Sequence, residues 1–348
     1  MRRARDGGPR CWGNNASGEL GDGTTTMRSS ATPVMGLASA SVLGVGQGHA
    51  CALDGSTLSC WGSNASGELG LGSTTPSSSS SPLAVTALPS GAVEDVSLGA
   101  GHSCAIVEGA LYCWGDNGEG QLGLGDRTPR LAPTAVALPG AERALRVDSF
   151  SVHTCALLAS GAVACFGDNT ENQVHAGATT SDALSPMLVP GIADAADVAT
   201  GSAHTCVLRR DGTVWCWGSS FAGQIGDGVF RPVPMPVTSP TPTAAIPDVV
   251  VQITAGSAHN CALTRGGLVY CWGDNSAGQV GRDSALEFML DEPTLLGGLT
   301  AVGEVAAGSF HTCVRTDAGT HLCLGDNTWG QLGRTGASSH TPMPVVWP

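Results

Sequence analysis

Residues 255–281, AGSAHNCALTRGGLVYCWGDNSAGQVG, contain the three motifs that decide the fold of this chain of 348 residues. The first motif is His-x-Cys at His259, the second is Cys-Trp-Gly at Cys271, and the third is Gly-Gln-Val-Gly starting at Gly278. All three recur about every fifty residues, and a fixed period of this length is typical of repeat architectures. The sequence therefore predicts several copies of one structural unit.

The positions of the motifs give the number of copies. Cys-Trp-Gly, or its variants Cys-Phe-Gly and Cys-Leu-Gly, stands at Cys11, Cys60, Cys113, Cys165, Cys216, Cys271 and Cys323. His-x-Cys stands at His49, His102, His153, His204, His259 and His311. The third motif opens at Gly18, Gly67, Gly120, Gly223, Gly278 and Gly330, and its fourth copy has degenerated to Gln173-Val174-His175. Seven units follow, the first of which has no His-x-Cys.

Within each unit the pattern indicates short β-strands. Segments such as 249–254, 260–264 and 268–272 are rich in apolar and β-branched residues and are bounded by glycine. About four such strands fit in one unit, and helical spacing is almost absent. This predicts an all-β, seven-bladed β-propeller that forms a single domain over residues 1–348. The expected blades are residues 1–37 (partial), 38–90, 91–139, 140–191, 192–247, 248–299 and 300–348.

Twelve of the thirteen cysteines fall into six local pairs. The pairs are Cys51/Cys60, Cys104/Cys113, Cys155/Cys165, Cys206/Cys216, Cys261/Cys271 and Cys313/Cys323. If paired cysteines face each other, the shorter spacing leaves a two-residue turn, and the longer spacing leaves a three-residue loop with glycine third. Directly opposite residues are within reach of a disulfide, so we expect six hairpin disulfides. Reduced, buried thiols are an alternative, as is metal binding with His-x-Cys, although a fourth ligand at a constant place is missing.

Cys11 is the odd cysteine, because no His-x-Cys hairpin precedes it. We therefore expect Cys11 to be unpaired and the first blade to be incomplete. The N-terminus has the basic start of a signal peptide but no apolar stretch after it. Six disulfides favour an oxidising compartment, so we expect a secreted or cell-surface protein whose signal peptide lies upstream of Met1.

Composition excludes several functions. The formal net charge is −13, which opposes binding to nucleic acid. All sixteen basic residues are arginine, so lysine-based Schiff-base chemistry and a P-loop lysine are excluded. The chain has no run of eighteen apolar residues, so the sequence predicts no membrane-spanning helix. No catalytic motif is visible, and we expect no enzyme activity, no cofactor and no metal.

The quoted stretch resembles the regulator of chromosome condensation repeat family, whose pattern is Gly-x-x-His-(Ser/Thr)-x-Ala-Leu, then Asp-Gly, then Trp-Gly-x-Asn-x-x-Gly-Gln-Leu-Gly. Residues 99–123 are a second good match, and the resemblance covers almost the whole chain. It implies a seven-bladed propeller. Members include a chromatin-bound exchange factor, a plant ultraviolet-B photoreceptor and a secreted bacterial propeller that inhibits β-lactamases.

The resemblance is specific for fold and leaves the function open. The photoreceptor's Gly-Trp-Arg-His-Thr motif is absent here, and chromatin attachment would need a basic face. The chain is therefore closest in style to the secreted bacterial members. We expect a non-enzymatic, extracellular protein-binding scaffold of unidentified partner. A glycan- or cell-wall-binding module is the alternative, and an exchange-factor-like protein or an enzyme is a weaker one.

Candidate contact residues are those that break the repeat. In the segment after Cys-Trp-Gly, where other copies have small or polar residues, the chain carries aromatic and methionine side chains. They are Phe221, Phe230, Met235, Phe288, Met289 and Trp329. Protein interfaces are enriched in such residues, so we expect some of them to contact a partner. Local packing of longer loops is the alternative.

Residues that occur in every copy are expected to serve the scaffold. We expect the six His-x-Cys histidines to hydrogen-bond the backbone near the inner strand. The Asp-Asn pairs, such as Asp116-Asn117, predict Asx-type turns, with calcium binding as the alternative. The tryptophans of Cys-Trp-Gly are expected to pack between blades.

Overall fold

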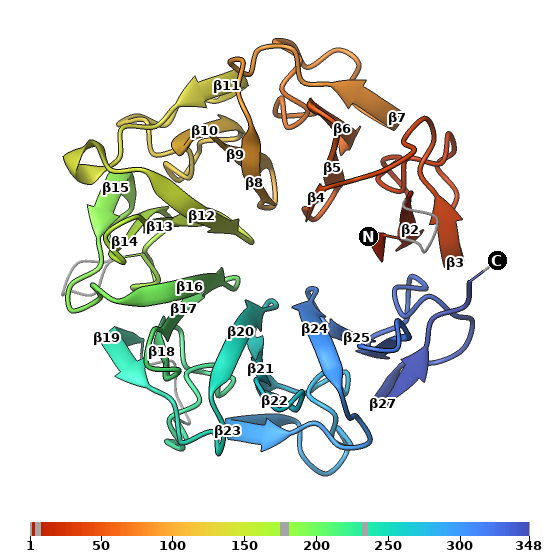
Figure 1. The fold of residues 1–348 in the computed structure, drawn as a ribbon, viewed down its shortest axis with the longest axis vertical. Coiled ribbons are helices and arrows are strands. Elements are labelled where there is room, and N and C mark those ends of the chain that lie inside the picture. Colours follow the sequence, from red (N-terminus) through yellow and green to blue (C-terminus); the bar gives the residue numbers. More distant parts are fainter. Residues whose placement is uncertain (1, 4–7, 175–180, 232–235, 348) are drawn as a thin grey trace.

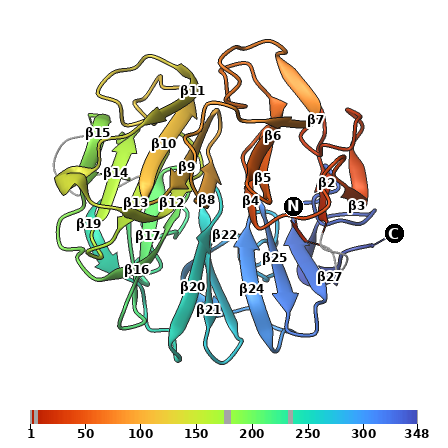
Figure 2. The same ribbon diagram turned by 45° about the horizontal axis from the view of Figure 1, so that its top comes forward.

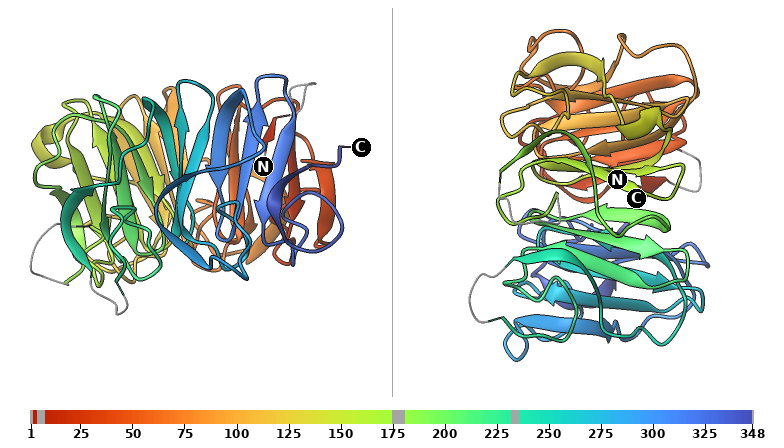
Figure 3. Two further views of the ribbon diagram at one scale, coloured as in Figure 1. Left: turned by 90° about the horizontal axis from the view of Figure 1, so that it is seen from below. Right: turned by 90° about the vertical axis from the view of Figure 1, so that its left-hand side faces the viewer.

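The computed structural model describes residues 2–3, 8–174, 181–231 and 236–347, and it is a ring of small β-sheets (Figure 1). Seen from the side, the ring is a flattened disc (Figure 3). Strands account for nearly all regular structure, and one short 3-10 turn, η1 (Pro139–Ala141), is the exception among the described residues. The prediction of an all-β propeller is confirmed.

Six of the sheets have four antiparallel strands, which follow one another in chain order from the ring axis outward (Figure 1). The first three sheets are β4 (Val42–Val45), β5 (His49–Asp54), β6 (Thr57–Ser63) and β7 (Ser78–Ala84); β8 (Val93–Leu98), β9 (His102–Val107), β10 (Ala110–Gly115) and β11 (Arg130–Ala135); and β12 (Ala144–Ser149), β13 (His153–Leu158), β14 (Val163–Gly167) and β15 (Ala183–Leu188). The next three are β16 (Ala195–Thr200), β17 (His204–Arg209), β18 (Val214–Gly218) and β19 (Val237–Pro242); β20 (Val250–Ala255), β21 (His259–Thr264), β22 (Val269–Asp274) and β23 (Met289–Leu295); and β24 (Val302–Ala307), β25 (His311–Thr316), β26 (His321–Gly325) and β27 (Ser339–Pro344).

The seventh sheet is the incomplete one. It consists of β1 (Arg2–Arg3), β2 (Pro9–Gly13) and β3 (Arg28–Pro33), and β1 is only two residues long. The strand β2 carries the first Cys-Trp-Gly, and β3 is the outer strand of this sheet. The expectation of a partial first blade is confirmed for the part of the chain that the structure describes.

The two faces of the disc carry different connections. In each four-stranded sheet, the first strand connects to the second, and the third to the fourth, on one face, which we call the loop face. The turns between the second and third strands, and the links to the next sheet, lie on the opposite face, which we call the hairpin face. In Figure 2 the strands of each sheet run between these two faces. Every segment after Cys-Trp-Gly therefore belongs to the loop face.

The hairpin cysteines pair as predicted. All six pairs are disulfide-bonded, and their Cα atoms lie 4.1 to 4.2 Å apart. In each hairpin the two cysteines are direct partners in the strand register, as in Cys155 and Cys165. The loops that were predicted to need a left-handed third residue have one, for example Gly212 with a φ of 85°. The register predicted from the cysteine spacing, with the turn residues as support, is therefore confirmed.

Outer strands are protected against pairing with other chains. In six of the seven, a proline occupies the position just before the residue that faces the Cys-Trp-Gly cysteine. These prolines are Pro82, Pro133, Pro186, Pro240, Pro293 and Pro342. Proline has no N–H to offer to an added strand, so it blunts a sheet edge. The exception is β3, which has Ala31 at this position.

Ala31 shows how the ring closes. Its N–H donates to the carbonyl of Val346, 3.1 Å away, and its side chain is buried against Val345 and Leu332. On the same seam, the indole N–H of Trp12 donates to the Gln331 carbonyl at 2.9 Å. The last and first sheets are therefore held together without a shared strand, at the place where both chain ends lie (Figure 1).

Candidate protein-binding face

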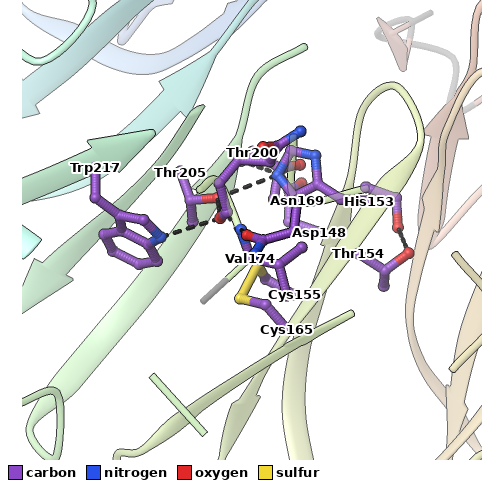
Figure 4. The surroundings of a disulfide bond; sticks show 12 residues. Asp148, His153, Thr154, Cys155, Cys165, Asn169, Val174, Thr200, Thr205 and Trp217 are labelled. Carbon is purple, nitrogen blue, oxygen red and sulfur yellow. Dashed lines mark hydrogen bonds between the residues drawn. A yellow bond between two sulfur atoms is a disulfide. The ribbon is translucent and has the colours of Figure 1, made fainter. Parts of the chain in front are cut away.

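The seams between blades contain the buried histidines. His153 Nε2 contacts Thr205 Oγ1 of the next sheet at 3.1 Å, and that hydroxyl donates to the Gln173 carbonyl at 2.7 Å. The indole N–H of Trp217 donates to the same carbonyl at 3.0 Å. Figure 4 shows this seam beside the Cys155–Cys165 disulfide. Since the hydroxyl gives its own hydrogen to the carbonyl, His153 is the donor through Nε2–H.

The same arrangement repeats around the ring. The histidines contact, in order, Ser103, Thr154, Thr205, Asn260 and Thr312 of the following sheet, at 2.8 to 3.1 Å. We expected these histidines to bond to backbone near the inner strand, and that expectation was wrong, because the partner is a side chain of the next blade. Burial in the seam lowers the pKa of His49 and His204 to about 4, and that of His102, His153 and His259 to about 3. They are neutral scaffold residues at physiological pH.

Six of the seven loops after Cys-Trp-Gly are held by a buried asparagine, and the loop that carries Phe221 has Ser220 at that position. Asn117 donates to the carbonyls of Asp126 and Thr128, at 2.8 and 3.1 Å, and accepts from the Leu122 N–H at 3.0 Å. The preceding Asp116 accepts from the Asn117 and Gly118 N–H groups, which is the predicted Asx-type turn. These six loops are therefore fixed from within, whereas the Phe221 loop is held by the Arg231–Asp227 ion pair and by the bond from the Gly228 N–H to the Asp291 carbonyl.

Four of the six predicted contact residues are exposed on this frame. Exposed fractions are 56% for Phe221, 58% for Phe230, 65% for Phe288 and 55% for Trp329. Met289 is partly buried at the start of β23. Met235 lies outside the described residues. The four exposed aromatic side chains all belong to the loop face, on three consecutive sheets, β16–β19, β20–β23 and β24–β27.

Neighbouring loops bring two of these side chains into one region. The loop with Phe221 packs on the first residues of β23, where a Cβ added to Gly223 would lie 2.6 Å from the Leu290 carbonyl oxygen. The N–H of Gly228 donates to the Asp291 carbonyl at 2.8 Å, just beyond Phe288 in the chain. The Phe221 loop therefore contacts the start of β23, directly after Phe288, at two points.

Further apolar side chains are exposed on this face, and Phe310 and Leu286 among them were not predicted from the sequence. Phe310 is 47% exposed in the β24–β25 connection, and Leu286 is 82% exposed in the loop before β23. Phe310 could have been found, because the residue before His-x-Cys is small or aliphatic in the other copies. We call Phe221, Phe230, Leu286, Phe288, Phe310 and Trp329 the apolar arc. The described parts of the loops after β6, β10 and β14 expose no large apolar side chain.

The two arginines in the loops of Phe221 and Phe288 are in ion pairs. Arg231 Nη2 lies 2.7 Å from Asp227 Oδ2, and Arg282 Nε lies 3.6 Å from Glu287 Oε2. Partial burial favours the neutral form of Asp227, but the hydrogen bond and charge of Arg231 outweigh it and lower the pKa of that carboxyl. These ion pairs stiffen the two loops without adding free positive charge to the surface.

Other parts of the described structure offer little for chemistry. No group of three or more His, Cys, Asp or Glu side chains gathers there in a way that could hold a metal ion. A shallow pocket of about 400 Å³ lies on the hairpin face, between the turn at Gly266 and the start of β24. Cys11 is buried, forms no disulfide, and has its pKa raised to about 11 by that burial. No described helix has the length and apolar character needed to cross a membrane.

Comparisons with known proteins agree with this architecture. The family model of the regulator of chromosome condensation (RCC1) repeat matches residues 57–106, 108–157, 211–263 and 266–315. A second model of the same repeat matches residues 93–121, 195–224 and 250–279. Together the matches cover more than half of the chain.

Similar curated proteins and solved structures come from several organisms. The chain is 32% identical to the ultraviolet-B receptor UVR8 of Arabidopsis thaliana over 261 residues, which is 74% of this chain and 58% of that protein. It is 32% identical to the probable E3 ubiquitin-protein ligase HERC6 of Homo sapiens over 234 residues, which is 66% of this chain but 23% of the ligase. It therefore spans less than two thirds of either relative.

Among solved structures, the Prp20p structure from Saccharomyces cerevisiae superposes with a TM-score of 0.87 at 24% identity, covering 99% of this chain and 87% of that one. Human WBSCR16 gives a TM-score of 0.84 at 20% identity, covering 97% and 94%. These likenesses establish the fold, and the matches of the repeat models establish the family. The chain belongs to the regulator of chromosome condensation (RCC1) repeat family.

Proposed function

We propose that this chain is an extracellular, non-enzymatic scaffold that binds a protein partner through the apolar arc. The observation that carries the proposal is the exposure of four aromatic side chains on three consecutive sheets of one face, on loops held by Asn275, by Asn327 and by the Arg231–Asp227 ion pair. Single exposed apolar residues are normal, whereas a group of them on a rigid surface is typical of an interaction site. Aromatic anchors of this kind carry much of the binding energy at protein interfaces.

The extracellular part of the proposal is supported by the disulfides. Six hairpins each hold a disulfide, one in every four-stranded sheet. Such bonds form and persist in oxidising compartments and are rare in a reducing cytosol. A chain that relied on them in a reducing compartment would lose about 2–3 kcal/mol of stabilisation for each hairpin loop of this size.

The non-enzymatic part is supported by what the histidines do. Histidine is the commonest general acid or base, and it must reach substrate to act. Here His49, His102, His153, His204 and His259 are buried in seams and bonded to the next blade. The same fold supports protein binding elsewhere, because yeast RCC1 (Prp20) has been crystallised bound to Kap60. At 23% identity that likeness concerns the fold, and its partner is not transferred to this chain.

The test is affinity capture with matched variants. The intact protein is immobilised and exposed to extracellular fluid from its source, beside the variant Phe221→Ala/Phe288→Ala/Trp329→Ala. A control, Leu145→Ala/Val251→Ala, removes exposed apolar side chains near the hairpin face. We expect a protein that is retained by the parent and the control and is lost by the arc variant.

Stability must be measured on the same samples. Each arc substitution should change the free energy of unfolding by less than about 0.5 kcal/mol, because few buried contacts are lost. Trp272→Ala, inside a seam, should cost about 3–5 kcal/mol. The binding face lies elsewhere if the arc variant retains the same proteins as the parent. It also lies elsewhere if the arc variant loses as much free energy of unfolding as Trp272→Ala does. Retention of glycans in place of proteins would favour the alternative of a glycan-binding module.

A further inference from the structure

The two loops at the centre of the apolar arc carry an excess of carboxylates. Segments 219–231 and 275–292 together contain five carboxylate side chains and two arginines. Both arginines are in ion pairs within their own loops. Asp283, Asp291 and Glu292 form no ion pair with any arginine that the structure describes. The segments on either side of the exposed Phe288 therefore carry three carboxylates that no described arginine neutralises.

One of these carboxylates, Asp283, is held by a hydrogen bond to its side chain, and Asp291 is held through its backbone. Asp283 accepts from the Ala285 N–H at 3.0 Å, and its carbonyl accepts from the N–H groups of Leu286 and Glu287, at 3.0 and 2.9 Å. The backbone of Asp291 is bonded to Gly228 of the preceding blade. A fixed carboxylate offers a preorganised contact, which reduces the ordering cost of binding a cation.

A partner's charge follows from this arrangement. An acidic surface brought against Asp283, Asp291 and Glu292 would place like charges side by side, which costs several kcal/mol. Arginine or lysine would instead neutralise the carboxylates and lie over the exposed rings as cation–π partners. The chain already uses such a contact within one sheet, where the Arg209 guanidinium lies 4.8 Å from the ring centroid of Trp215. Its net charge of −13 would also steer a basic partner towards it.

We propose that the partner of the apolar arc is a protein with a basic docking surface, whose arginine or lysine side chains meet Asp283, Asp291 and Glu292 and cover the exposed aromatic rings. This rests on the proposed function, since it names the chemistry of the partner at the same site. The contact is off the ring axis, over sheets β16–β19 to β24–β27. Neutral apolar partners and acidic partners are excluded by the proposal.

The test uses a displayed library of random peptides with unbiased charge. The library is selected on the intact protein and depleted on the variant Phe221→Ala/Phe288→Ala/Trp329→Ala, so that only arc-dependent peptides survive. We expect the survivors to be enriched in arginine or lysine together with aromatic or aliphatic residues. Selected peptides are then synthesised and their affinity is measured at about 0.05 M and about 0.3 M salt, across which exposed charge pairs become screened.

A charge-neutral variant gives the second measurement. Asp283→Asn/Asp291→Asn/Glu292→Gln keeps the acceptor that the Ala285 N–H uses, and it should weaken peptide binding about tenfold at the lower salt and much less at the higher. The matched control, Asp54→Asn/Glu108→Gln/Asp317→Asn, makes the same change of charge on three hairpin-face turns and should bind as the parent does.

The outcomes separate this inference from the function on which it rests. Arc-dependent peptides without an excess of basic residues, or with affinity unchanged in the charge-neutral variant, would overturn the basic partner and leave the binding face standing. Peptides that bind the arc variant as well as the parent would overturn the binding face itself. A selection in which nothing is enriched over the arc variant would overturn both.

Discussion

Lowering the pH from about 7.5 to about 5.5 should destabilise this protein strongly, because its seams bury neutral histidines. Five of them have no exposed surface. They are His49, His102, His153, His204 and His259. Burial lowers the pKa of each to about 3 or 4, whereas the unfolded chain has the ordinary value near 6.5. Below pH 6.5 the histidines of the unfolded chain therefore bind protons, whereas those of the folded chain do not.

The sign and size follow from this difference. A depressed histidine pKa contributes stability that is fully present above about pH 6.5 and is lost as the pH falls towards the folded-state value. Over the two pH units, each histidine lowers the free energy of unfolding by about 1.3 kcal/mol, and the five together lower it by roughly 6–7 kcal/mol. That is comparable to the whole stability of a typical domain, which is about 5–15 kcal/mol. Asp148 opposes it, since burial raises its pKa to about 6 and its protonation would return about 1 kcal/mol.

The assay is denaturation by guanidinium chloride, followed by tryptophan fluorescence, at several pH values with the disulfides intact. His153→Gln should retain a donor towards Thr205 and remove one titrating group. Between the two pH values its free energy of unfolding should therefore fall by about 1.3 kcal/mol less than that of the parent. If the free energy of unfolding of the parent changes by less than about 2 kcal/mol between the two pH values, these histidines do not stay neutral in the folded seam. The same follows if the free energy of unfolding of the variant depends on pH as steeply as that of the parent.

Three further substitutions or treatments test single contacts. Ala31→Pro copies the other outer strands but removes the N–H that closes the ring, and should lower the free energy of unfolding by about 1–2 kcal/mol, whereas Pro133→Ala should change it little. Thr205→Val removes the hydroxyl between His153 and a backbone carbonyl, and should cost about 1–3 kcal/mol in denaturant titrations because a buried donor loses its partner. Cys11 should resist alkylation in the native protein and react once the chain is unfolded, as mass spectrometry of the labelled peptides would show; rapid native labelling would contradict its burial.

Much of the fold could be predicted because an inference from one copy of the repeat can be checked against the other copies. Glycine third in four loops, such as Gly161 and Gly212, and two-residue turns in the other two hairpins agreed with a register in which each paired cysteine lies opposite its partner. The histidine contacts could not be read from one copy, because the acceptor belongs to the following blade. The sequence also does not show which side chains are exposed to solvent. Met289 was therefore grouped with Phe288, although the structure leaves Met289 partly buried.

The contacts between blades also change how a departure from the repeat should be interpreted. The residue between the histidine and the cysteine of His-x-Cys is polar in five copies and is Ala50 in the first. In the other copies this residue accepts from the histidine of the preceding sheet, and the described strands of the sheet before Ala50, β1 to β3, contain no histidine. Ala50 is buried and meets no histidine from these strands. Ala31 is explained by the carbonyl that its N–H meets.

Departures of this kind belong to the scaffold even though they break the symmetry. Phe221, Phe288 and Trp329 are different, because most of each side chain faces solvent and no neighbouring blade accounts for the change. Symmetry breaking alone would have counted Ala31 and Ala50 as candidate contact residues beside them. Exposure separates the two groups, since a residue that differs for the sake of a neighbouring blade is covered by that blade. The apolar arc thus consists of departures from the repeat that the ring leaves largely exposed, which is the property expected of residues that contact a partner.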